Sequence, residues 1–220
     1  MSEMFDCTDP AQRESGIASA ISALKGGRLV VMPTDTVYGL GADAFDGEAV
    51  ASLLAAKGRG RDMPVPVLVG SWHTIQGLVY TVPNSAKELI RAFWPGALSL
   101  VVRQAPSLQW DLGDANGTVM LRMPLHPVAI ELLREVGPMA VSSANISGNP
   151  PAVTAAAAQE QLGDRVEVYL DGGPAEQQAA STIVDLTGAH PRVLRQGPVT
   201  LDAIAEVLGV EPVTLTDRPD

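Results

Sequence analysis

The chain has 220 residues, of which 46% are hydrophobic and 18% charged, and its formal net charge is −10. This composition is typical of a globular protein that buries a sizeable core, and the acidic balance argues against a broad nucleic-acid surface, which needs many cations. The single cysteine, Cys7, excludes a disulfide framework. With no signal-peptide pattern and no apolar run of about 20 residues, we expect a cytoplasmic protein without a membrane segment.

Capping residues, glycine stops and apolar spacing predict helices over residues 10–24, 49–57, 85–94, 127–136, 154–162 and 201–208. Short apolar runs predict strands at 28–32, 67–69, 98–103, 118–123, 139–141, 166–170, 182–186 and 192–194. Because helices and strands alternate irregularly, we predict an α/β (or α+β) fold with a twisted mixed β-sheet flanked by helices. No repeat or linker interrupts the pattern. We therefore expect a single domain over residues 1–220, with a core of about 10–208 and a mobile C-terminal tail.

The loop at residues 33–41 follows a buried strand and is the most informative stretch of the chain. It brings together two threonine hydroxyls, the Asp35 carboxylate and the Tyr38 phenol, and it ends in two glycines. Loops at strand ends carry function because a rigid scaffold can aim their side chains at a ligand. The alternative is a polar turn with a glycine stop. We favour a functional loop because two further polar stretches occur downstream.

The first of these stretches is basic. Lys57, Arg59 and Arg61 alternate with glycines, which let backbone amides approach an anion closely while the cations supply charge. Phosphate is the natural ligand for such a group. Taken alone, the pattern fits equally well a helix C-terminus whose carbonyls are capped by basic side chains. No glycine-rich loop ending in Lys-Ser or Lys-Thr is present, which excludes an ordinary P-loop nucleotide site.

The second stretch, residues 142–151, follows a predicted buried strand and is rich in Ser, Asn, Gly and Pro. Its hydroxyl and amide groups suit the oxygens and ring nitrogens of a polar ligand, although alone this composition favours a turn. Arg122 and Arg195 sit in or at the end of apolar strands, and Ser181 precedes another. A buried arginine needs an anion, so Arg122 binds either a ligand or an Asp or Glu of the protein.

Two other patterns are discounted. Gly39, Gly41 and Ala44 match the spacing of a dinucleotide fingerprint, but Gly41 lies nine residues beyond Met32, whereas that fingerprint starts directly at the strand end. The histidines at 73, 126 and 190 are scattered and lack the spacing of zinc ligands. We expect no metal site built from protein side chains.

In this order, the polar stretches resemble the YrdC-like family of L-threonylcarbamoyladenylate synthases. The matching segments are residues 33–41, 57–59, 94–96, 122–124, 143–145, 181–183 and 195–198. The resemblance implies a twisted mixed sheet with a large concave groove. It also implies an enzyme that makes threonylcarbamoyl-AMP from L-threonine, bicarbonate and ATP, and releases pyrophosphate. That product feeds the t6A modification of adenosine 37 in tRNA.

The resemblance also implies roles for single residues. Thr36, Arg122 and Ser181 would hold L-threonine, with Arg122 on its carboxylate. Lys57 and Arg59 would be the catalytic cations on the ATP phosphates, with Mg²⁺ accompanying ATP. The rest of the nucleotide site would comprise Thr118, Ser143, Asn145 and Arg195.

Two positions depart from the family pattern: Met63 and Leu68 stand where relatives often carry a polar residue and a histidine. Longer members of the family carry a second C-terminal domain, so the chain resembles the short, single-domain type. A separate tRNA threonylcarbamoyl transferase complex would receive the product. Any direct binding of tRNA by this chain would be weak. The alternative function is a double-stranded RNA or tRNA-binding module of the same fold, and a further rival is a carbamoyl-adenylate enzyme that uses carbamoyl phosphate.

Overall fold

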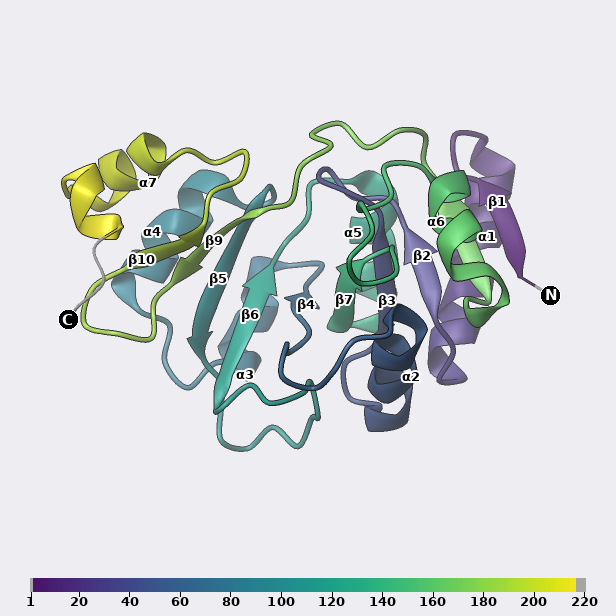
Figure 1. The fold of residues 1–220 in the computed structure, drawn as a ribbon, viewed down its shortest axis with the longest axis horizontal. Helices are drawn as coiled ribbons and strands as arrows, with labels where there is room; N and C mark the ends of the chain where they lie inside the picture. The colour runs from purple at the N-terminus through teal and green to yellow at the C-terminus, as the bar shows by residue number, and fades with distance from the viewer. Residues whose placement is uncertain (1, 217–220) are drawn as a thin grey trace.

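The computed structural model describes residues 2–216. All strands in this range belong to one continuous mixed sheet (Figure 1). The sheet order is β1-β8-β2-β3-β7-β4-β6-β5-β9-β10, with parallel and antiparallel neighbours. The strands are β1 (Glu3–Asp6), β2 (Val30–Met32), β3 (Gly39–Asp43), β4 (Val67–Leu68), β5 (Leu98–Arg103), β6 (Thr118–Arg122), β7 (Met139–Ser143), β8 (Val168–Asp171), β9 (Thr182–Asp185) and β10 (Arg192–Arg195). The predicted twisted mixed sheet is confirmed.

Helices flank this sheet, and short 3-10 turns complete the elements. The helices are α1 (Pro10–Lys25), α2 (Gly47–Lys57), α3 (Ile75–Leu78), α4 (Asn84–Phe93), α5 (Pro127–Val136), α6 (Ala155–Leu162) and α7 (Leu201–Leu208). The 3-10 turns are η1 (Trp72–Thr74), η2 (Gly163–Arg165) and η3 (Pro212–Leu215). No helix within residues 2–216 is long and apolar enough to cross a lipid bilayer.

The core has two parts because successive side chains of a strand point to opposite faces of a sheet. On β2, Val30 and Met32 pack in a cluster with apolar residues of α1 and α5. Val31 lies between them in the sequence and joins the larger cluster, which includes apolar residues of α2, α4, α6 and α7. All three β2 side chains are completely buried. Both faces of the central strands are therefore covered, which holds the strand ends in fixed positions.

The longer predicted helices are confirmed, and the capping signals were accurate. The Asp9 side chain accepts hydrogen bonds from the Ala11 and Gln12 amides at the start of α1, and Thr154 caps α6 in the same way through Ala157. Such caps satisfy amides that have no partner inside the helix. The short helix α3 and the turn η1 were not predicted.

The prediction that residues 33–41 are entirely loop is wrong. Gly39–Asp43 forms β3, which pairs antiparallel with β2 and with β7. A Cβ on Gly39 would lie 2.7 Å from Val141 Cγ1, and one on Gly41 would lie 2.5 Å from Met139 Cε. These glycines therefore let β3 pack closely against β7 rather than ending an element. The strand β1, which pairs with β8, was also missed.

The mobile tail predicted beyond residue 208 is only partly covered by the structure. Residues 212–215 form η3, and the Leu215 side chain is buried in the larger core cluster. Residues 217–220 lie outside the described residues.

Candidate functional site

A cavity of about 320 Å³ lies across neighbouring strands of the sheet, from β3 to β10. Its walls combine small polar side chains, apolar side chains and three arginines. The lining residues are Thr34, Thr36, Val37, Tyr38, Gly39, Arg59, Pro64, Pro66, Leu68, Ser99, Met120, Arg122, Val141, Ser142, Ser143, Pro151, Ala180, Ser181, Ile183 and Arg195. None of them is acidic, so the cavity suits an anionic ligand.

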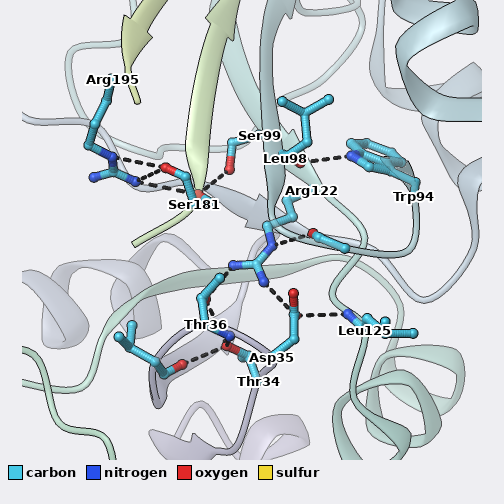
Figure 2. Close-up of polar contacts among 12 residues, drawn as sticks. Thr34, Asp35, Thr36, Trp94, Leu98, Ser99, Arg122, Leu125, Ser181 and Arg195 are labelled. Carbon is cyan, nitrogen blue, oxygen red and sulfur yellow. Dashed lines mark hydrogen bonds and ion pairs between the residues drawn. The ribbon is translucent and has the colours of Figure 1, made fainter. Parts of the chain in front are cut away.

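Arg122 lies at the centre of the polar wall, at the end of β6 (Figure 2). Its Nη2 donates to Asp35 Oδ1 at 2.5 Å, its Nη1 to Thr36 Oγ1 at 2.7 Å, and its Nε to the Gly96 carbonyl at 2.9 Å. These bonds fix the plane of the guanidinium and leave two of its five N–H groups for a ligand. The predicted alternative of an ion pair with a protein carboxylate is thus confirmed, and Arg122 also lines the cavity.

Asp35 is the buried counter-charge of this arginine. Its side chain is only 4% exposed, and Oδ1 also accepts a hydrogen bond from the Leu125 amide at 2.8 Å. Burial lowers the pKa of Arg122, and the neighbouring Asp35 acts in the opposite direction by favouring the charged guanidinium. Of the two side chains, only that of Arg122 lines the cavity.

The loop that carries Thr34, Asp35 and Thr36 is held at both ends. It connects β2 to β3, and the Tyr38 amide donates to the Ala152 carbonyl. The Tyr38 hydroxyl contacts Asp171 at the end of β8 and donates to the Gly173 carbonyl at 2.5 Å. Burial raises the pKa of Tyr38, so this hydroxyl keeps its proton. The loop is thereby fixed against the strand ends.

A second polar group, formed by Ser99, Ser181 and Arg195, lines the same cavity (Figure 2). The hydroxyl oxygens of Ser99 and Ser181 are 2.8 Å apart. Arg195 Nε and Nη2 donate to the Ser181 carbonyl at 3.0 and 2.8 Å. This places the predicted residues Ser181 and Arg195 on the same cavity as Arg122. Sequence analysis missed Ser99; a serine between two leucines of a buried strand was the signal that could have identified it.

The three cations of the basic stretch have three different environments. Arg59 lines the cavity; its Nη1 donates to Ser142 Oγ at 3.2 Å, while its Nε is buried and lacks a partner within the described part of the chain. A buried donor without a partner is costly, so this nitrogen suits an anionic ligand oxygen. Arg61 points elsewhere and forms a fork with Asp111 at 2.9 and 2.7 Å. Gly58 ends α2 in a left-handed conformation, as the helix-stop alternative predicted.

Lys57 is buried beneath the polar wall. Its Nζ donates to the Ser143 carbonyl at 2.5 Å, to the Asn145 carbonyl at 2.8 Å and to Asn145 Oδ1 at 3.1 Å. An ammonium has three donors, so all three are used inside the protein. Burial, with a smaller contribution from Arg59, lowers the pKa of Lys57 to about 8. Lys57 and Asn145 do not line the cavity themselves. They hold Ser143, which does line it.

The remaining predicted positions are divided between the cavity and its surroundings. Asn145 Nδ2 donates to the Ile146 and Asn149 carbonyls and so also stabilises the turn after β7. Thr118 begins β6, four residues before Arg122, and its hydroxyl donates to the Ala115 carbonyl; it does not line the cavity. Of the two departures from the family pattern, Leu68 lines the cavity and Met63 is exposed on the surface.

Metal-binding side chains do not gather around this cavity. Within residues 2–216, no group of three or more His, Cys, Asp or Glu side chains is placed to hold a metal ion. His126 is half-buried, and burial lowers the pKa of its imidazole. The donors that surround the cavity are hydroxyls, backbone groups and guanidinium groups, which are the groups that bind carboxylates and phosphates.

Comparison with known proteins identifies this architecture. A family model described as "Telomere recombination", which covers the Sua5, YciO and YrdC proteins, matches residues 22–197. A Mycobacterium tuberculosis protein, provisionally named a threonylcarbamoyl-AMP synthase, is 78% identical over 215 residues, or 98% of this chain and 99% of that protein. The chain therefore belongs to the Sua5/YciO/YrdC family, as the sequence motifs indicated.

A relative from Pyrococcus abyssi connects the family to a ligand. The threonylcarbamoyl-AMP synthase of that organism is 37% identical over 194 residues, which are 88% of this chain and 57% of the relative. The crystal structure of P. abyssi Sua5 complexed with L-threonine superposes with a TM-score of 0.85 at 36% identity. The match covers 93% of this chain and 61% of that one, so the chain spans about three fifths of the archaeal protein.

Proposed function

We propose that this chain is an L-threonylcarbamoyladenylate synthase. It combines L-threonine, bicarbonate and ATP into threonylcarbamoyl-AMP and releases pyrophosphate, and the product serves t6A modification of tRNA in the cytoplasm. The observation that carries this proposal is a cavity with three arginines and no acidic lining residue, in a chain with a net charge of −10. A relative of the same fold, P. abyssi Sua5, has been crystallised with L-threonine.

Threonine would bind at the wall formed by Thr36, Arg122 and Ser181. The two unused N–H groups of Arg122 suit a carboxylate, which a planar guanidinium binds strongly. Asp35 limits the net positive charge at this wall without facing the ligand. The apolar side chains of Leu68 and Val141 provide a surface for the aliphatic part of the amino acid.

ATP phosphates would bind where Arg59 and Arg195 converge on the cavity. The unpartnered Nε of Arg59 and the exposed position of Arg195 leave both side chains able to contact phosphate oxygens. Ser143 would contact the nucleotide, held from behind by Lys57 and Asn145. A direct contact between Lys57 and a phosphate, which would require it to give up one of its three bonds, stays a prediction, as does the role of Thr118.

The proposed chemistry needs positioning and charge neutralisation rather than a protein nucleophile. The threonine amine first combines with bicarbonate to give a carbamate, with loss of water. A carbamate oxygen then attacks the α-phosphorus of ATP, a phosphorus–oxygen bond forms, and the bond to the pyrophosphate leaving group breaks. Cations that meet the phosphates stabilise the charge that develops during such an in-line transfer. Arg59 and Arg195 are placed for that task.

Mg²⁺ would enter the site with ATP. The described residues offer no cluster of metal-ligating side chains, so the phosphates of the nucleotide would hold the ion. When bound, Mg²⁺ would offset phosphate charge alongside the two arginines. A separate tRNA-modifying transferase would consume the product.

The test is pyrophosphate release from ATP, measured with and without L-threonine and bicarbonate. We expect turnover only when both are present, and Arg59→Ala should reduce it by a factor of about 10² or more because a phosphate cation is lost. Arg61→Ala is the matched control, since this arginine is in the same segment but pairs with Asp111 away from the cavity. Threonine-independent turnover, or equal activity in both variants, would refute the proposal.

A further inference from the structure

Two threonine hydroxyls form a hydrogen-bonded chain that ends at Arg122 (Figure 2). Thr34 Oγ1 donates to the Val37 carbonyl at 2.6 Å. The same oxygen lies 3.1 Å from Thr36 Oγ1 and accepts the Thr36 amide at 3.2 Å. Thr36 Oγ1 in turn accepts from Arg122 Nη1 at 2.7 Å. Both threonines are buried, with exposed fractions of 3% and 1%.

The direction of each hydroxyl proton in this series of hydrogen bonds follows from the number of protons and lone pairs that each hydroxyl has. A hydroxyl has one proton and two acceptor lone pairs. Thr34 gives its proton to Val37, so it cannot also donate to Thr36. The Thr36 hydroxyl must therefore donate to Thr34, so its proton is held in a hydrogen bond within the loop and is not available to a ligand. One lone pair of Thr36 accepts from Arg122, and the other remains.

Thr36 consequently offers the cavity an acceptor and no donor. A ligand carboxylate has only acceptors when ionised and gains nothing from this oxygen. A ligand N–H or O–H can donate to the remaining lone pair. The donors that a carboxylate needs are supplied instead by the two unused N–H groups of Arg122, beside Thr36.

We propose that Thr34 is a positioning residue that holds the Thr36 proton within the loop, so that Thr36 acts only as an acceptor and selects a hydrogen-bond donor of the amino-acid substrate. This inference rests on the proposed function. It fixes the orientation of the ligand: the carboxylate lies toward Arg122, and the nitrogen or the side-chain hydroxyl lies toward Thr36. Thr34 itself has no free proton with which to bind the substrate, since its only one is held by Val37.

The test compares amino-acid binding to the wild type, Thr34→Val and Thr34→Ser by calorimetry. Valine at this position has nearly the shape of threonine but cannot accept the Thr36 proton, so that proton becomes free to turn toward the ligand. We expect about tenfold weaker L-threonine binding in Thr34→Val, the size of one net hydrogen bond, and near wild-type binding in Thr34→Ser. Thermal unfolding checks that each variant is folded.

Tyr169→Phe is the matched control. The Tyr169 hydroxyl also donates to a backbone carbonyl, that of Gly163, at 2.8 Å, and the residue does not line the cavity. Its loss should leave threonine affinity unchanged. Titration with L-valine, which replaces the substrate hydroxyl by a methyl group, distinguishes the two donors. If Thr36 accepts from the hydroxyl, Thr34→Val lowers the preference for threonine over valine; if it accepts from the nitrogen, both affinities fall together.

Three results separate failure of this inference from failure of the proposed function. Absence of threonine binding by the wild-type chain would refute the function. Threonine binding by the wild type that is unchanged in Thr34→Val would refute the inference alone. Equal weakening in Thr34→Val and Thr34→Ser would also refute it, because serine keeps the hydroxyl that the argument requires.

Discussion

At the scale of single residues, the site depends on how the charge of one buried arginine, Arg122, is balanced by its neighbours. Placing Arg122 and Asp35 inside the protein removes both from water, which costs several kcal/mol for each ion before their attraction offsets it. The additional bonds to Thr36, Gly96 and Leu125 satisfy the remaining groups. A hydrophobic pair could give equal stability, so we attribute the arrangement to function: it fixes a guanidinium at the cavity wall.

Asp35→Asn tests this attribution. The amide keeps an oxygen that can accept from the Leu125 amide, but it leaves the Arg122 charge buried without a counter-ion. We expect the free energy of unfolding to fall by about 3–5 kcal/mol, the cost of breaking a buried pair, and the KM for threonine to rise. Denaturant unfolding and steady-state kinetics measure the two effects.

Asp111→Asn is the control, because the Asp111–Arg61 pair is about half exposed on both sides and such pairs contribute little to stability. An Asp35→Asn protein with the stability and threonine KM of the wild type would show that the buried pair does not support the site.

At the scale of elements, the sequence predicted those helices, strands and polar residues that local sequence signals mark. Helix α1 followed from its Asp9 cap and the glycines after it, and Arg122 and Ser181 were singled out as polar groups in or beside apolar strands. Strand β3 was missed because Gly39 and Gly41 read locally as a stop. Their use becomes visible only when β7, about 100 residues away, packs against them. Likewise, spacing placed Lys57 near Arg59 but could not show that its ammonium points to Ser143 and Asn145.

The segment after β10 offers a test at this scale. A Cβ on Gly197 would lie 2.6 Å from the Thr182 amide nitrogen and 2.7 Å from the Ser181 carbonyl carbon. Both are backbone atoms that cannot move aside without displacing the start of β9. We therefore expect Gly197→Ala to lower the melting temperature and to reduce kcat/KM by at least about tenfold, because it moves the wall that carries Ser181 and Arg195.

Gly188→Ala is the control for this substitution. Gly188 is exposed in the turn between β9 and β10, and its nearest neighbour, the His190 carbonyl oxygen, would lie 3.8 Å from the new Cβ. We expect this variant to match the wild type in melting temperature and kcat/KM. If Gly197→Ala behaves in the same way, the close approach of the two segments is not needed for the site.

At the scale of the whole molecule, the cavity exists only because the sheet brings distant segments together. Its lining residues come from segments far apart in the sequence: the loop before β3, the segment after α2, the end of β6, the end of β7 and the strands β9 and β10. Three arginines meet there although the chain as a whole is acidic. No local pattern encodes such convergence. The sequence therefore singled out some residues that line the cavity, namely Thr36, Arg59, Arg122, Ser143, Ser181 and Arg195, together with Lys57, Thr118 and Asn145, which do not line it.

The most direct test of the account is a crystal structure of the chain with L-threonine and a non-hydrolysable ATP analogue. We predict the amino acid in the cavity of about 320 Å³, with its carboxylate at Arg122 and the phosphates beside Arg59 and Arg195. A larger groove of about 550 Å³ beside Trp72 and Trp94 provides the alternative location. Ligands bound only in that groove, or a 320 Å³ cavity that stays empty at saturating ligand, would contradict the account.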